Sequence, residues 1–151
     1  MSKRAVNLLR NMAVPMKRDG NNPNYGFVGV KTTTANTTLT AADSGKVIFL
    51  DGSTTHDVTL PSAATGLNYH FILVDATADV DIVQAAATED FVGTVVDGAG
   101  SSDTALAGDT KIIFSQSGGA AAGDWVKLVC YNDDDWMVAG NCDAAGGVVF
   151  G

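Results

Sequence analysis

The chain has 151 residues, of which 46% are hydrophobic and 17% are charged, and its formal net charge is −8. These figures favour one domain with a substantial core and exclude a wholly disordered protein. Val, Thr, Gly and Asp are abundant and Glu89 is the single glutamate, so strands are favoured over helices. No apolar run reaches the roughly 18–20 residues that cross a bilayer, and the N-terminus lacks a signal-peptide core. We therefore expect a protein made in a cytoplasm, without a membrane segment.

The charge is divided unevenly along the chain. Residues 1–31 carry six basic residues against one acid, Asp19, which gives +5, whereas residues 32–151 carry three lysines against sixteen acids, which gives −13. We expect a basic N-terminal arm and linker over residues 1–40 and an acidic β domain over residues 41–151. Such a split predicts that the arm contacts an acidic surface, either outside its own domain or on its own body.

The arm contains a short amphipathic pattern. Apolar side chains recur at helical spacing between a candidate N-cap, Ser2, and a helix-stopping Pro15. A helix this short is stable only when it packs against something else. The turn-rich segment Arg18–Gly26 is predicted to be a linker, and the Thr-rich residues 32–40 to be an extended arm or an edge strand. The apolar positions of the helical pattern are Ala5, Leu8, Leu9 and Met12.

From Lys46 onward, short apolar runs alternate with turn residues. The separators are mostly Gly, Asp and Ser, which are typical of turns between strands. This pattern predicts an all-β domain, namely a β-sandwich or a jelly-roll-like body, with the basic arm extending from it. The expected strands are Lys46–Asp51, Asp57–Leu60, Tyr69–Val74, Val80–Gln84, Phe91–Val96, Lys111–Ser115, Trp125–Tyr131, Trp136–Ala139 and Val148–Phe150.

The last two long strands are expected to form a hairpin. A loop at Asn132–Asp135 places Tyr131 opposite Trp136 and Val129 opposite Val138, so that these four share one side. Because both sides are then substantially apolar, we expect a core on each side, or a core on one side and a partner subunit on the other. The second side would carry Val126, Leu128, Cys130 and Met137.

The two cysteines, Cys130 and Cys142, do not form a disulfide framework or a metal motif. In the hairpin register above, Cys142 lies opposite Trp125 rather than Cys130. We therefore expect two free thiols and no metal or cofactor.

Few residues suggest enzymatic chemistry. The run Asp133–Asp135 invites a calcium loop or paired catalytic carboxylates, but it lacks the glycine and glutamate of an EF-hand and is better explained as a solvated turn. Of the two histidines, His56 is expected to be exposed in a loop and His70 to lie in a strand, and neither accompanies a GxSxG or HExxH motif. The glycines form no phosphate-binding loop. We expect no enzyme.

Two classes of binding remain open. Trp125, Tyr131 and Trp136 can stack on sugar rings, although aromatic residues in hairpins more often fill a core or a subunit interface. The basic arm can contact nucleic acid, but the acidic body repels phosphates and the arm has no interleaved aromatic residues. An acidic patch on a protein partner, with apolar side chains of the arm in a groove, agrees better with the sequence.

Two stretches resemble structural proteins of tailed-phage virions. The first is LTAADSGKVIFLDGSTTHDVTLPSAATGLNYHFILV, Leu39 to Val74, and it is similar to a phrase found in head-decoration and tail-fibre modules. The second is GDWVKLVCYNDDDWMVAG, Gly123 to Gly140, which resembles the strand-turn-Trp-strand ending of such modules. Here an Asp run replaces the usual Gly/Asn-rich turn, so a metal or glycan role is not carried over.

The resemblance implies a non-enzymatic capsid decoration (cement) protein. Such a protein coats the outside of the phage head and stabilises contacts between major capsid protein subunits, and a chain without heptads or a shaft agrees better with this role than with a long fibre. Partners would be the major capsid protein and further copies of this chain, with a trimer favoured over a dimer, but not nucleic acid. The alternatives are a short tail module that binds a host glycan and a small hydrolase that uses Asp133–Asp135. Attachment is assigned to Lys3, Arg4, Leu8, Leu9, Arg10, Met12, Lys17 and Arg18, and subunit packing or core to Trp125, Tyr131 and Trp136.

Overall fold

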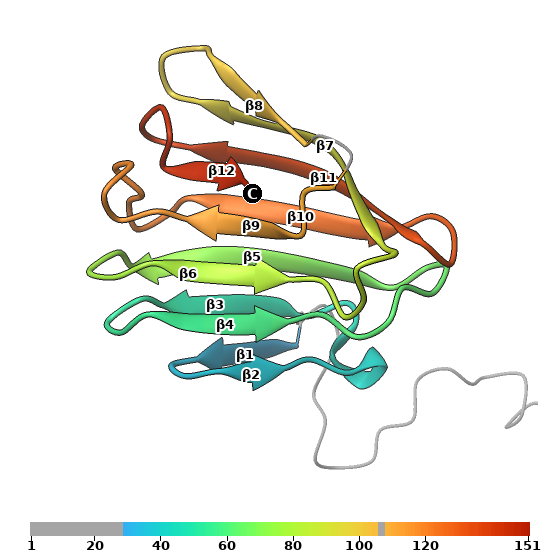
Figure 1. Cartoon of the computed structure of the whole chain (residues 1–151). Coiled ribbons are helices and arrows are strands. Elements are labelled where there is room, and N and C mark those ends of the chain that lie inside the picture. Colours follow the sequence, from blue (N-terminus) through green and yellow to red (C-terminus); the bar gives the residue numbers. More distant parts are fainter. Residues whose placement is uncertain (1–28, 106–107) are drawn as a thin grey trace, which may run out of the picture.

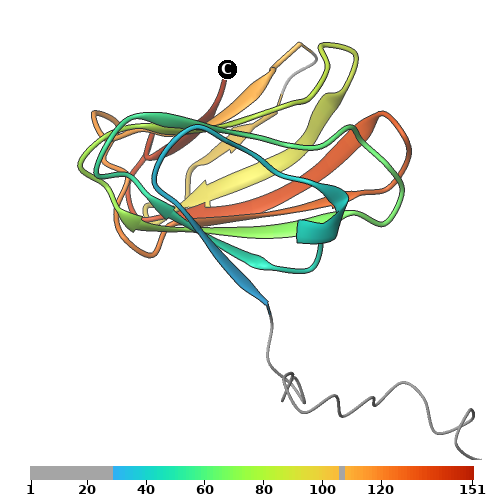
Figure 2. The same cartoon turned by 90° about the horizontal axis from the view of Figure 1, so that it is seen from below.

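The computed structural model describes residues 29–105 and 108–151, which form a β-sandwich of two sheets. One sheet has seven strands in the order β1-β3-β5-β10-β11-β7-β8, and the other has five in the order β12-β9-β6-β4-β2. Figure 1 shows the two sheets one behind the other, and Figure 2 shows the two layers from the end formed by β1 and β2. The predicted all-β sandwich is confirmed.

Every strand expected from the sequence is present, with small changes at its ends. Three short strands, β1, β2 and β8, and one 3-10 turn, η1, are added to them. The elements are β1 (Val30–Thr33), β2 (Thr37–Thr38), η1 (Ala41–Asp43), β3 (Val47–Asp51), β4 (His56–Thr59), β5 (Asn68–Asp75), β6 (Val80–Val83), β7 (Asp90–Asp97), β8 (Ser102–Thr104), β9 (Lys111–Phe114), β10 (Trp125–Cys130), β11 (Asp135–Cys142) and β12 (Val148–Phe150).

The first six strands form three stacked β-arches. In each arch the chain runs along the seven-stranded sheet, turns, and returns in the five-stranded sheet, and successive arches pair in parallel. Two of the turns are closed in the same way, because Asp51 Oδ1 accepts from the Ser53 amide and Asp75 Oδ1 from the Thr77 amide. Gly52 lets these turns stack closely, since a Cβ there would lie 2.4 Å from the carbonyl oxygen of Asp75. Parallel stacking of this kind is absent from an antiparallel jelly roll.

The second half of the chain completes both sheets. Strand β10 pairs antiparallel with β5 and with β11, while β9 pairs antiparallel with β6 and with β12. Strand β7 joins β11 in parallel, and the two backbones come together at Gly93, where φ is +150°. A Cβ at this position would lie 1.9 Å from the carbonyl oxygen of Val138, so glycine is required.

The core lies between the sheets and is built by alternation along the strands. In β10, for example, Val126, Leu128 and Cys130 are buried while the residues between them are exposed or half-buried. Trp136 of β11 is fully buried and lies 5.9 Å, between ring centroids, from Tyr69 of β5. The Tyr69 hydroxyl donates to the carbonyl oxygen of Thr40, and burial raises its pKa to about 12. A continuous cluster of apolar side chains from both sheets therefore fills the space between them.

The β domain begins before residue 41, at which the boundary between arm and domain was expected. Residues 30–33 and 37–38 are strands β1 and β2, which occupy the edge of each sheet. Of the two alternatives for residues 32–40, the edge strand is the correct one. Asp43 fixes this edge, since its carboxylate pairs with Lys31 at 3.1 Å and with Lys46 at 2.7 Å.

The expected hairpin register is wrong by one residue. Strand β11 already begins at Asp135, so the loop is 131–134, and Trp136 pairs with Cys130 rather than with Tyr131. Trp136 therefore points into the core, while Met137, expected on the opposite side, points outward. Asn141 rather than Cys142 lies opposite Trp125. Both cysteines are free thiols, as expected, and both are buried.

Candidate functional site

The outer face of the seven-stranded sheet carries two apolar rows that cross its strands. In one row, Phe49, Ile72 and Trp125 lie side by side on β3, β5 and β10. In the other, Val129, Met137 and Val92 lie side by side on β10, β11 and β7. The members of the second row are 48%, 43% and 39% exposed. Exposed apolar residues gathered in rows on one face indicate an interaction surface. We call this surface the outer face.

Two polar side chains separate the apolar rows. His70 of β5 and Lys127 of β10 are cross-strand neighbours, and both line two adjoining recesses. The larger recess has a volume of about 260 Å³ and also includes Lys46, Asn68 and Val129 in its lining. The smaller recess, of about 140 Å³, is completed by Ile72 and Trp125. We call the two together the His70–Lys127 recess.

One ring nitrogen of His70 makes no hydrogen bond to the described residues. Its Nε2 atom is buried and has no hydrogen-bond partner among the described residues. The imidazole meets the Trp125 ring edge-on, with 5.6 Å between centroids. Burial, and then the positive charge of Lys127, lower the pKa of His70, because both disfavour the imidazolium. The neutral ring can donate or accept one hydrogen bond at Nε2.

Lys127 is the only lysine of residues 29–105 and 108–151 without an ion pair. Lys31 and Lys46 share Asp43, and Lys111 pairs with Asp81 at 2.8 Å. The Lys127 ammonium lies instead 5.9 Å from the centroid of the Trp125 ring, as in a cation–π contact. The recess therefore presents an unneutralised positive charge on an otherwise acidic body, which is suited to a carboxylate.

The loop between β10 and β11 forms a protruding acidic tip. Asn132 organises it, because its Oδ1 accepts from the amides of Asp134 and Asp135 and its Nδ2 donates to Asp135. The Tyr131 hydroxyl also donates to Asp135, at 2.8 Å, and this hydrogen bond raises the pKa of Tyr131, while Asn132 and Tyr131 lower that of Asp135. Asp133 accepts from the amide and hydroxyl of Thr65.

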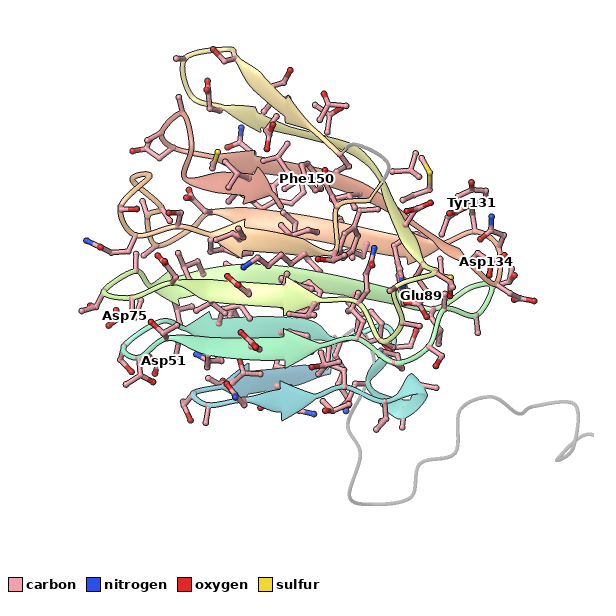
Figure 3. The ribbon with its side chains drawn as sticks, in the orientation of Figure 1. Asp51, Asp75, Glu89, Tyr131, Asp134 and Phe150 are labelled. Atoms are coloured by element: carbon pink, nitrogen blue, oxygen red, sulfur yellow. The ribbon has the colours of Figure 1, made fainter. Side chains whose placement is uncertain are left out.

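Asp134 differs from its neighbours in this loop. It is exposed, and its carboxylate has no hydrogen-bond or ion-pair partner among the described residues. Figure 3 shows Tyr131 and Asp134 together at the tip, at the opposite end of the sandwich from Asp51 and Asp75. The three aspartates do not converge, and no group of three metal-ligating side chains occurs within 29–105 and 108–151.

The aromatic residues proposed for subunit packing or core occupy three different environments. Trp136 lies in the core, Trp125 is half-buried on the outer face, and Tyr131 is 52% exposed in the loop. They do not form a common sugar-stacking platform. The residues assigned to attachment lie outside the described part of the chain; they are Lys3, Arg4, Leu8, Leu9, Arg10, Met12, Lys17 and Arg18.

His56 is not exposed in a loop as expected, but is buried as the first residue of β4. Its Nδ1 lies 2.9 Å from the carbonyl oxygen of Thr54, to which it donates. Its Nε2 lies 3.2 Å from the hydroxyl of Thr33, which leaves both ring nitrogens satisfied. The hydrogen bond between Thr33 of β1 and His56 of β4 therefore connects the first two arches inside the sandwich.

Glu89 was not recognised from the sequence, although it is the single glutamate. It is buried in the segment before β7, where Oε1 accepts from the amide of Ala63 at 2.8 Å and Oε2 from Trp136 Nε1 at 3.3 Å. Figure 3 places it near the end of the sandwich that carries the acidic tip. A further hollow of about 200 Å³, between β7, β8 and β12, includes Cys142 and Asp97. Burial raises the pKa of the Cys142 thiol, which disfavours the nucleophilic thiolate.

Comparison of the chain with known protein families, with curated proteins and with solved structures finds no match. Within the described residues, no helix is long and apolar enough to cross a membrane.

Proposed function

We propose that this protein is a non-enzymatic decoration protein of a phage head. It binds the outside of the capsid and stabilises contacts between major capsid protein subunits. The observation that carries the proposal is the combination of a basic N-terminal segment, an acidic sandwich and an exposed apolar outer face. One face of the body then contacts other subunits, and the acidic remainder keeps the particle surface soluble.

The basic arm provides attachment in this proposal. Residues 1–28 carry five cations against Asp19, and the described body carries four lysines against sixteen acids. The cations of the arm can contact phosphates, but the acidic body repels nucleic acid. The arm instead binds an acidic groove on the major capsid protein through its cations and its apolar stripe. Many copies on one shell add avidity to each weak contact.

Self-association is the second part of the proposal. The outer face supplies the apolar area, and a homo-oligomer, a trimer in preference to a dimer, couples neighbouring capsid positions. Closed symmetric oligomers are the common outcome when one face of a protein recognises another copy.

Attachment is tested by removal of residues 1–18 and measurement of binding to capsid shells assembled without this protein. The full chain is expected to saturate the shells, and the truncated chain to lose most of its affinity. A matched control replaces the five cations of residues 1–18 by glutamine and keeps the length. Unchanged affinity of the truncated chain would refute the role of the arm, and failure of the full chain to bind shells would refute decoration itself.

A tail module that binds a host glycan is the second candidate, and the half-buried Trp125 beside the two recesses favours it. Imaging of intact particles with a labelled antibody separates the two candidates. Label over the whole head supports decoration, whereas label confined to the tail supports receptor binding.

A further inference from the structure

We propose that the acidic tip of one copy docks into the His70–Lys127 recess of a second copy, with Asp134 of the tip paired to Lys127 of the recess. The inference deepens the self-association part of the proposed function by naming the two surfaces that meet. It rests on three observations: an unpaired lysine, an unpaired carboxylate, and apolar rows on either side of the lysine.

The recess resembles the centre of a protein–protein interface, because a polar group lies between apolar side chains. Lys127 forms its polar centre, with the half-buried ring of His70 beside it. The apolar rows of Ile72 with Trp125, and of Val129 with its neighbours, lie on either side. A charged pair that is enclosed by apolar contacts excludes water and fixes the register of the docked partner.

The tip offers the complementary group. Asp134 is exposed and free of partners within the described chain, while Asn132 and the backbone hold the loop around it in one conformation. Tyr131, which is 52% exposed beside it, adds an aromatic anchor of the kind that is enriched at interfaces. A loop that is already ordered loses little conformational entropy when it binds.

The two surfaces cannot meet within one molecule. Lys127 lies in the middle of β10, whereas Asp134 follows the end of that strand and points away from the body in Figure 3. A tip-to-recess contact is therefore heterologous: each copy uses a different surface toward each neighbour. Such contacts close into a ring when the rotation between copies allows it, which agrees with the trimer proposed above.

The acidic body explains why this contact is selective. Sixteen acids against four lysines in the described residues make most pairs of surfaces repel each other. Within residues 29–105 and 108–151, only Lys127 presents an unneutralised positive charge to the approaching copy. Charge complementarity of this kind steers association and suppresses other orientations.

The test is a charge swap, measured by sedimentation on the full chain across the micromolar to millimolar range. Lys127→Glu and Asp134→Lys are each expected to weaken self-association by about ten-fold or more, because each places like charges together. The chain that carries both changes is expected to regain association to within a few-fold of the wild type.

Two matched controls locate the effect. Asp143→Lys reverses an exposed aspartate at the opposite end of β11, and Thr104→Glu adds a negative charge elsewhere on the outer face. Both are expected to leave association unchanged, and circular dichroism and urea midpoints verify that every variant is folded.

Three results would overturn the proposal: a monomeric wild type throughout the range, single variants that associate normally, or a double variant that does not recover. A monomeric wild type would also refute the self-association part of the proposed function, whereas the other two results would refute only the contact between tip and recess. Because no capsid shells are present, none of the three results decides whether the arm attaches to a head, so failure of attachment is distinguished from failure of this contact.

Discussion

Loss of the Glu89 carboxylate is expected to destabilise the sandwich by a predictable amount. Glu89→Ala leaves two buried donors without an acceptor, namely the amide of Ala63 and the indole N–H of Trp136. Each buried unsatisfied donor costs about 1–3 kcal/mol, so the free energy of unfolding should fall by about 2–6 kcal/mol. Glu89→Gln keeps one acceptor oxygen but turns an amide NH₂ toward the other donor, and it should cost about 1–3 kcal/mol.

The assay is urea unfolding followed by tryptophan fluorescence, since Trp136 reports directly on the site. In a thermal scan, the alanine variant should unfold roughly 6–18 °C below the wild type, at about 3 °C per kcal/mol for a domain of this size. Asp90→Asn, at the next residue, is the control, because the Asp90 side chain has no hydrogen-bond or ion-pair partner among the described residues and its loss is expected to matter little. A loss below about 0.5 kcal/mol for Glu89→Ala, in the range of ordinary surface substitutions, would refute the reasoning.

Two further predictions concern the edge of the sheet and the parallel β7–β11 pair. The hydrogen bond from Lys46 holds the pKa of Asp43 well below its usual range. The stabilisation by the Asp43 carboxylate is therefore complete above about pH 5 and is lost progressively as the pH falls through and below the ordinary carboxyl pKa. Asp43→Asn should therefore cost about 1–2 kcal/mol at pH 7, a figure reduced because the lysine side chains are about one-third exposed. The difference in urea midpoint should shrink steadily as the pH falls below about 4, and a constant difference would contradict this account. Gly93→Ala should cost about 2–3 kcal/mol in urea unfolding, because its Cβ would lie 1.9 Å from the carbonyl oxygen of Val138, whereas Gly29→Ala should be tolerated; equal midpoints for the two variants would contradict the close approach.

The strands could be predicted because alternation along each run is strong. In the expected strand Lys46–Asp51, for instance, Ile48 and Leu50 alternate with half-buried residues, as the structure confirms. The pairing of strands was harder to predict, because parallel stacking of arches depends on contacts between turns. The structure pairs Thr37-Thr38 with Val58-Thr59, and each pair precedes a leucine, but a recurrence of three residues is too short to predict a strand pairing.

The candidate site could be predicted only in part. An outward apolar side of the hairpin was expected, but the predicted register was wrong by one residue. Asp135, which was counted with the loop, already belongs to β11 and pairs with Asp90 of β7. A shift of one residue exchanges the two sides of a strand, so Trp136 moved to the core and Met137 to the surface. Neither Glu89 nor the unpaired state of Lys127 is visible in the sequence, since both depend on residues distant along the chain.

Because β7 pairs in parallel with β11, the two ends of the chain differ in how soon their strands meet their pairing partners during synthesis. Of the first three arches, the second and the third each pair with the arch made just before it. The N-terminal part of the sandwich can therefore fold one arch at a time as it leaves the ribosome. Strand β7 is made about 45 residues before β11, and until then its only neighbour is the short β8. Nascent chains that stop early should therefore display Phe91 and Val95 to chaperones, and a shortened C-terminus should be far more damaging than a shortened N-terminus.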